Sequence, residues 1–363
     1  PELATTLSGA IADAGGLPMA PLRTTSSLLS AYAPVGNDGE GDDGPTETAR
    51  RQGRRITAKI PTVLAAFERA RNGEEPVSPD PDLSYAGNFL YMLTGTVPDA
   101  VSEETFDMAL TLHADHGLNA STFTAMVIGS TMADVYSGVT GGIGALSGAL
   151  HGGANQDVMG VLHEIEQSSK DPVAWVKDAR DDGRRIPGFG HRVYKVKDPR
   201  ARILQEKLQD LSESSGDSKW LDYTSAIEEY LTDQGLLDKG IAPNVDFYSG
   251  SVYDSLGIPV DMYTPIFAMS RAGGWIAHMV EYQADNRLIR PRARYIGAEN
   301  ADFVPVDERS AVWRSLGAGS PLAVRECTRR VEPRSRSATT RTARRRPSPA
   351  ARGRRRGAVP PAR

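Results

Sequence analysis

Residues Gly141–Val158 read GGIGALSGALHGGANQDV, and the interpretation of the whole chain begins with this stretch. Gly, Ala and Ser recur in it at helical spacing, and such small residues let backbones approach closely. His151 follows them and is itself followed by two glycines, so we expect it on the turn between a tightly packed helix and the next one. Taken alone, the pattern also fits two buried helices that cross with a histidine at the corner. A dinucleotide-binding motif is excluded, because no β-branched strand precedes the glycines and no acidic residue follows at the required distance.

Two more turns that carry a polar residue are expected further along the chain. The stretch PGFGHRVYKVKDPRA, residues 187–201, places His191 on a Gly-rich turn, and APNVDFYSG, residues 242–250, places Asp246 in a turn bounded by Pro and Gly. Carbon–carbon bond formation beside a carbonyl needs a base for a weakly acidic C–H, a donor to the enolate oxygen and a donor to the electrophilic carbonyl. Two loop histidines and one loop carboxylate can supply these three groups.

The motifs HGGANQ, GFGHRVYKVKDPR and NVDFYSG, in this order and at these separations, closely resemble citrate synthase, of the citrate/2-methylcitrate synthase family. The resemblance runs from about Gly16 to about Arg309, and it implies an all-α fold of two domains. Residues 1–152 and 258–313 would form a large helical domain and 153–257 a small one, with further helical chain expected ahead of the first residue. Few stretches of the sequence alternate apolar and polar residues with a period of two. This pattern independently favours helix over strand.

The resemblance also implies an enzyme that condenses acetyl-CoA with oxaloacetate and water to give citrate and CoA. In it, Asp246 would be the base, His151 the donor to the thioester oxygen, and His191 the group that polarises and protonates the ketone. Acetyl-CoA would be a co-substrate, with no permanently bound cofactor, and the chain would form a homodimer in which Arg290 acts across the interface. The implied substrate-binding residues are His116, Arg200, Arg271 and Arg290, and the implied coenzyme-binding residues are Gly188, Gly190, Lys195 and Arg69.

Some of these roles are also supported by the residues themselves. Arg271 lies inside a strongly apolar run, where a charge is costly unless it meets an anion. The basic Gly-rich loop before Asp198 is a natural anion cradle. Nucleic-acid binding is the rival interpretation of this loop, but Tyr194 alone gives little aromatic interleaving. Arg69 fits equally well as a solvated charge that balances the dipole of its helix.

Local patterns predict the main helices and argue against a metal site. The spacing of apolar residues predicts helices over 48–71, 156–177 and 264–281, one that starts near Ser102, and two within 201–238. His113 and His116 share a helix face, but no further ligand cluster accompanies them. The segment HEIEQ at His163 lacks the second histidine of a zinc motif, so no metal is expected and His113 is interpreted as a buried structural residue.

Composition sets the remaining bounds. Of the 363 residues 39% are apolar, no 18-residue apolar run exists, and no membrane span is expected. The chain opens without a charged-then-apolar leader, and the lone Cys327 cannot form an internal disulfide, so a cytoplasmic location is expected.

The net charge of −4 conceals an asymmetry between body and tail. Residues 314–363 hold 15 Arg and two Glu, a balance of +13, which leaves −17 for residues 1–313. An acidic body with few Lys suits a salt-rich, halophile-like cytoplasm. The tail is predicted to be disordered. A reading-frame error in GC-rich DNA is the favoured explanation of it, and a basic appendage that binds nucleic acid non-specifically, or a membrane surface, is the other.

Two alternative functions remain at this point. One is 2-methylcitrate synthase, which uses propionyl-CoA with the same catalytic set. The other is a non-catalytic helical scaffold that binds nucleic acid through its tail, and the presence of Asp246 with both histidines argues against it.

Overall fold

Regular structure in the computed structural model is helical throughout the residues that it describes, which are 17–32, 44–296, 303 and 305. In this part of the chain the β-type pairing is an isolated bridge between Phe189 and Pro243. The predicted all-α fold is therefore confirmed. None of the described helices is long and apolar enough to cross a membrane. The sequence predictions for residues 1–16 and for the basic tail fall outside the described residues.

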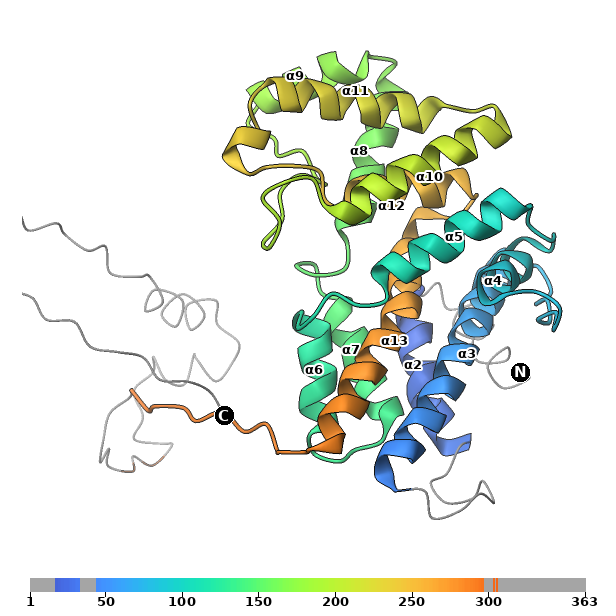
Figure 1. Ribbon diagram of the computed structural model, residues 1–363, viewed down its shortest axis with the longest axis vertical. Helices are drawn as coiled ribbons and strands as arrows, with labels where there is room; N and C mark the ends of the chain where they lie inside the picture. Colours follow the sequence, from blue (N-terminus) through green and yellow to red (C-terminus); the bar gives the residue numbers. More distant parts are fainter. Residues whose placement is uncertain (1–16, 33–43, 297–302, 304, 306–363) are drawn as a thin grey trace, which may run out of the picture. The chain divides into compact units, whose positions relative to one another are not determined.

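Helix α13 is the centre of one group of helices (Figure 1), where it packs against α3, α5, α6 and α7. Its buried side includes Trp275 and Met279. The members of this group are α2 (Met19–Leu28), η1 (Leu29–Tyr32), α3 (Pro45–Arg71), α4 (Tyr85–Thr94), α5 (Ala100–His113), α6 (Ala120–Gly129), α7 (Val135–Leu146) and α13 (Tyr263–Ala284).

A second group of helices packs around α12, which contacts α8, α10 and α11, while α9 packs on α11. Helix α5 touches both α4 and α10 and so connects the two groups, as Figure 1 shows. The members are α8 (Ala154–Ser168), α9 (Pro172–Asp181), α10 (Pro199–Ser215), α11 (Lys219–Asp233), η2 (Leu237–Lys239), α12 (Val245–Ser255) and η3 (Val260–Met262).

The predicted helices over 48–71 and 264–281 are present as α3 and α13, and two helices occupy the region 201–238 as predicted. The single helix predicted over 156–177 is wrong, because the chain breaks between α8 and α9. Ser169 takes a left-handed φ of 53°, and Asp171 caps α9 by accepting a hydrogen bond from the Ala174 N–H. Pro172 then occupies the first helical position, where its missing N–H costs nothing.

Two other local predictions need correction. The helix expected to start near Ser102 begins earlier, since Asp99 accepts hydrogen bonds from the Val101 and Ser102 N–H groups. Asp246 lies in the first turn of α12 rather than in a loop, because Asn244 caps that helix through the Asp246 N–H. An Asn or Asp side chain satisfies a free N–H at a helix start, so helices begin where such a residue stands.

The corner between α7 and α8 explains one of the glycines after His151. A Cβ on Gly152 would lie 2.3 Å from the Leu146 carbonyl oxygen. Only glycine therefore lets the chain turn this tightly, and His151 lies on the corner between two helices as predicted.

Candidate active site

Six of the residues predicted to act on substrate meet where the two helix groups adjoin. The rings of His116 and His191 are 5.2 Å apart between centroids. Arg200 and Arg271 both lie near enough to the Asp246 carboxyl to influence its pKa. Arg271 likewise acts on the pKa of His151. The residues of this cluster, called the acid–base cluster below, are His116, His151, His191, Arg200, Asp246 and Arg271.

The loop that carries His191 is fastened to the extended segment before α12. The Gly190 N–H donates to the Ala242 carbonyl at 2.8 Å, and the Asn244 side chain donates to the Gly190 carbonyl at 2.9 Å. At the far end of the loop, the Asp198 N–H donates to the Pro243 carbonyl at 3.0 Å. These bonds set the position of His191 relative to the start of α12.

The proton of His191 is placed by its own loop. Its Nδ1 accepts hydrogen bonds from the N–H groups of Val193 and Tyr194, at 3.0 and 3.2 Å. A backbone N–H can only donate, so in the neutral ring the proton is on Nε2. Burial lowers the pKa of His191 below its ordinary value, which keeps the ring neutral. His191 therefore presents an Nε2–H donor.

His151 is fixed in the opposite tautomer. The Ser121 N–H donates to its Nε2 at 3.2 Å, and the Ser121 hydroxyl is 2.8 Å from the same atom. The ring proton is therefore on Nδ1. Burial, and then the charge of Arg271, lower the pKa of His151. A neutral histidine with a proton on Nδ1 can donate to an oxygen that gains negative charge during a reaction.

Asp246 has the environment of a general base. Burial raises the pKa of its carboxyl to about 6, and the nearby Arg200 and Arg271 oppose this rise. A carboxylate with a pKa near the working pH is a stronger base than an ordinary one and is still largely ionised at pH 7.

The two arginines of the cluster differ in their partners. Arg200 forms an ion pair with the fully buried Asp198, with Nε and Nη2 at 3.1 and 2.7 Å from the two carboxylate oxygens. Arg271 is 2% exposed, and its Nε donates to the His113 carbonyl at 2.7 Å. Within the described residues no carboxylate forms an ion pair with Arg271. Burial, and then Arg200, lower the pKa of its guanidinium to about 10.

The prediction that His113 and His116 share a helix face is wrong, because α5 ends at His113, while His113 is the buried residue that was predicted. His113 is buried, its Nδ1 lies 2.7 Å from the Ala109 carbonyl, and burial lowers its pKa to about 4. The Nε2 atom of His116 is buried without a hydrogen-bond partner among the described residues. His116 therefore has an unused ring nitrogen beside His191.

The remaining predicted site residues do not belong to the acid–base cluster. Arg69 is held by its own chain, since it pairs with Glu74 at 3.0 Å and donates to the Glu75 carbonyl at 2.6 Å. Arg290 is exposed, and within the described chain no interaction joins it to the acid–base cluster.

The predicted coenzyme-binding residues of the His191 loop lie beside the cluster. Lys195 is exposed, and its Nζ lies 3.2 Å from the His191 carbonyl. Gly188 and Gly190 both take positive φ, 80° and 86°, on the His191 loop.

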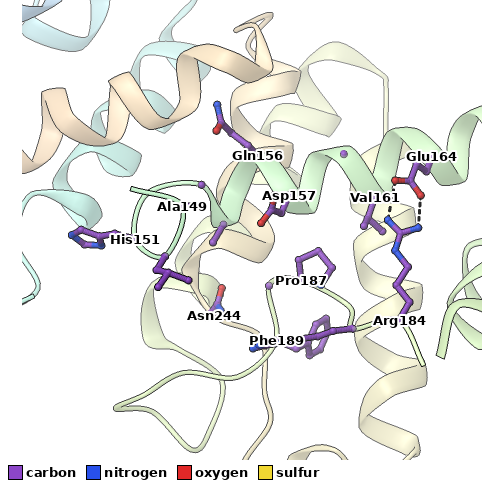
Figure 2. A pocket seen from close by; sticks show the side chains of 16 residues that line it. Ala149, His151, Gln156, Asp157, Val161, Glu164, Arg184, Pro187, Phe189 and Asn244 are labelled. Atoms are coloured by element: carbon purple, nitrogen blue, oxygen red, sulfur yellow. Dashed lines mark hydrogen bonds and ion pairs between the residues drawn. The ribbon is translucent and has the colours of Figure 1, made fainter. Parts of the chain in front are cut away.

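A pocket of about 640 Å³ opens beside His151 (Figure 2). It lies between the first turns of α8 and the loop 184–189, which includes Gly188, and Asn244 also lines it. Figure 2 shows His151 at one end and the Arg184–Glu164 ion pair at the other, with Nη1 and Oε2 2.6 Å apart. The neighbouring Arg185 also lines the pocket and is exposed.

Sequence reasoning did not single out four residues that the structure brings to this region. Ser121 fixes the tautomer of His151 from 30 residues away, and Asp198 neutralises Arg200. Arg184 and Arg185 line the pocket beside His151. The adjacent arginines were a visible signal in the sequence, whereas the contact of Ser121 with His151 left none.

Comparison with known proteins shows the family of the chain. The family model "Citrate synthase, C-terminal domain" matches residues 2–292. Citrate synthase of Haloferax volcanii is 59% identical over 292 residues, which are 80% of this chain and 76% of that protein. Citrate synthase 2 of Bacillus subtilis is 49% identical over 294 residues, 81% of this chain and 76% of that protein.

Among solved structures, the ternary complex of Thermoplasma acidophilum citrate synthase with carboxymethyl coenzyme A and oxaloacetate is similar, with a TM-score of 0.73 and 32% sequence identity. The match covers 85% of this chain and 80% of that one. Together with the acid–base cluster, these matches define the chain as an enzyme rather than a helical scaffold. The chain belongs to the citrate synthase family.

Proposed function

We propose that this chain condenses acetyl-CoA with oxaloacetate and water to give citrate and CoA. The observation that carries the proposal is the meeting of a carboxyl of raised pKa, Asp246, with two neutral histidines that carry their protons on opposite ring nitrogens. One base and two hydrogen-bond donors are what the condensation of a thioester with a ketone needs.

The first step is removal of a proton from the acetyl methyl group. Asp246 takes this proton, and His151 Nδ1–H donates to the thioester oxygen, so that negative charge does not accumulate there. The resulting enol attacks the ketone carbon of oxaloacetate. His191 Nε2–H polarises that ketone and gives its proton to the oxygen as the new carbon–carbon bond forms. Water then cleaves the thioester of citryl-CoA and releases CoA and citrate.

Arginines and His116 orient the oxo acid. Arg271, buried without a carboxylate partner in the described chain, binds one substrate carboxylate through two parallel hydrogen bonds. Arg200, whose charge Asp198 neutralises and whose side chain it holds in place, supplies hydrogen-bond donors to the substrate. His116 donates from its unused Nε2. Arg290 completes the site of the other subunit in a homodimer, which agrees with its exposure in the single chain.

The coenzyme lies in the pocket beside His151. Its phosphates meet the positive charges of Arg184 and Arg185, and the backbone at Gly188 and Gly190 lies close to it. Lys195 and, from the neighbouring subunit, Arg69 are the other coenzyme-binding residues that we propose. Acetyl-CoA is a co-substrate here, and the reaction uses no permanently bound cofactor or metal.

We further propose that residues 1–152 and 258–313 move as a large domain against 153–257. The corner at Gly152 and the segment between α12 and α13 are the two connections between the helix groups, so they are the hinges. His151 lies at one hinge and Asp246 beyond it, and closure assembles the site and excludes water.

The homodimer forms in part through α7. A Cβ atom added to Gly141 or Gly142 would meet Ile128 or Trp275 of the same chain, whereas one added to Gly144 would have no described neighbour within 4 Å. Gly144 is therefore the position on α7 that leaves room for a helix of the second subunit.

Release of thiol from acetyl-CoA in the presence of oxaloacetate tests the proposed function. We expect turnover with acetyl-CoA to exceed that with propionyl-CoA, and the opposite ratio would identify a 2-methylcitrate synthase. Absence of thiol release from both would reject condensation. We also propose a cytoplasmic enzyme adapted to salt, and activity that rises toward molar salt is the expected result.

A further inference from the structure

A half-buried polar network joins α10, α11, α12 and the end of the His191 loop, and it involves none of the residues of the acid–base cluster. Its centre is Glu228 on α11, whose side chain is 17% exposed. Both oxygens of this carboxylate lie 2.8 Å from the Lys197 ammonium. The hydroxyl of Tyr248, a fully buried residue of α12, donates to the same carboxylate.

The two partners of Glu228 stand next to the catalytic groups in sequence. Lys197 immediately precedes Asp198, which holds Arg200, and it ends the loop that carries His191. Tyr248 is two residues after Asp246 on α12. One carboxylate therefore holds both the His191 loop and the helix of the base.

The contacts in the network favour a single geometry. The Lys197 ammonium also donates to Gln205 on α10 at 2.5 Å and lies 5.0 Å from the centre of the Tyr248 ring. Burial, together with Glu228, raises the pKa of Tyr248 above its ordinary value, so its hydroxyl keeps its proton and remains a donor. The pair is half-buried, so loss of the Glu228 charge would leave the Lys197 ammonium and the Tyr248 hydroxyl without their shared carboxylate partner.

We propose that Glu228 is a positioning residue, which holds the His191 loop in register with the Asp246 end of α12. The proposal rests on the proposed function, since it assumes that His191 and Asp246 act on substrate. Proton transfer depends steeply on the placement of the groups involved, and a misplacement of about 1 Å costs on the order of 100-fold in rate. The network does not line the pocket beside His151.

The test compares Glu228→Gln with Glu229→Gln in the full chain. Glu229 is the next residue on α11, is exposed, and undergoes the same loss of charge. We expect Glu228→Gln to lower kcat by about tenfold or more relative to Glu229→Gln, with the KM for acetyl-CoA changed by less than about twofold. Circular dichroism first establishes that both variants are folded. A smaller difference in kcat between the folded variants, or a loss that appears only in the KM for acetyl-CoA, overturns the proposal.

Tyr248→Phe provides a second variant if Glu228→Gln does not fold. It removes only the hydroxyl on the α12 side and leaves the Lys197–Glu228 pair, so we expect kcat to fall by about threefold or more at an unchanged KM for acetyl-CoA. A smaller change in a folded Tyr248→Phe protein overturns the proposal. If the wild-type chain releases no thiol, the proposed function itself fails. If the wild type is active and the variants match their control, only the role of Glu228 fails.

Discussion

Replacement of Asp246 by Asn separates catalysis from stability. Asn has the same size and cannot act as a base, and loss of a general base typically costs on the order of 100- to 10,000-fold in turnover. The same change removes a charge that the fold does not favour. Burial raises the pKa of this carboxyl from 3.8 to about 6. We therefore expect an inactive protein that is more stable than the wild type at neutral pH.

The magnitude follows from the pKa difference between the folded and unfolded chain. A rise of about two units corresponds to about 3 kcal/mol by which the ionised carboxylate destabilises the fold. The folded pKa is the higher one, so this penalty is complete above about pH 6 and disappears below about pH 4. The stabilisation by Asp246→Asn should therefore be about 3 kcal/mol at pH 8 and about half of that at pH 5. At pH 8 it raises the melting temperature by on the order of 5 °C.

Two assays check this reasoning. Thermal unfolding of both proteins at pH 8 and pH 5 gives the stability difference, and the wild-type pH profile of kcat/KM for acetyl-CoA should fall below about pH 6 as the base becomes protonated. An Asp246→Asn protein that is less stable than the wild type at pH 8, or a stability difference that is the same at both pH values, would refute the assigned environment. Retention of more than about a tenth of wild-type turnover would refute the role of Asp246 as the base.

Three further predictions concern binding, assembly and the tail. Arg271→Leu should weaken oxaloacetate binding steeply and Arg271→Lys should restore it only in part, because an ammonium cannot form two parallel bonds; equal binding by wild type and the Leu variant in calorimetry would reject the assignment. Mixing inactive Arg290→Ala and Asp246→Asn subunits under mild denaturant should recover some activity, since one site of a heterodimer takes Arg290 and Asp246 from intact copies; no recovery means that Arg290 does not act across the interface. Deletion of residues 314–363 should leave the melting temperature nearly unchanged near 1 M salt, where the Debye length is ~3 Å; a large loss of stability would make the tail a structural element.

The fold could be predicted from the sequence because periodicity and caps are local signals. The apolar spacing located α3 and α13, and the error over 156–177 arose where an Asp-Pro pair interrupts an otherwise continuous pattern. Asp171 and Pro172 are themselves a helix-start signal, so this break could have been found. In the same way, Asn244 two residues before Asp246 could have placed the carboxylate on a helix.

Which residues meet in the acid–base cluster could also be predicted, but not the protonation state of each group. Motifs named the two histidines, yet their tautomers are set by N–H groups at Ser121 and within the 193–194 turn. The Ser121 contact spans 30 residues and has no local pattern. A histidine can donate or accept at either nitrogen, so its role in a reaction follows only from such contacts.

The contrast between Arg200 and Arg271 shows what the structure adds to a sequence motif. Both arginines were predicted to bind substrate, but Arg200 is already neutralised by Asp198 two residues earlier. Arg271 is more deeply buried and has a backbone carbonyl and the face of Phe267, 4.6 Å from its guanidinium carbon, as neighbours. A charge in this position is stabilised fully only when an anion enters from outside. An oxo acid bound at Arg271 would therefore relieve a cost that folding leaves there, and for this reason we expect Arg271 rather than Arg200 to dominate the affinity for the oxo acid.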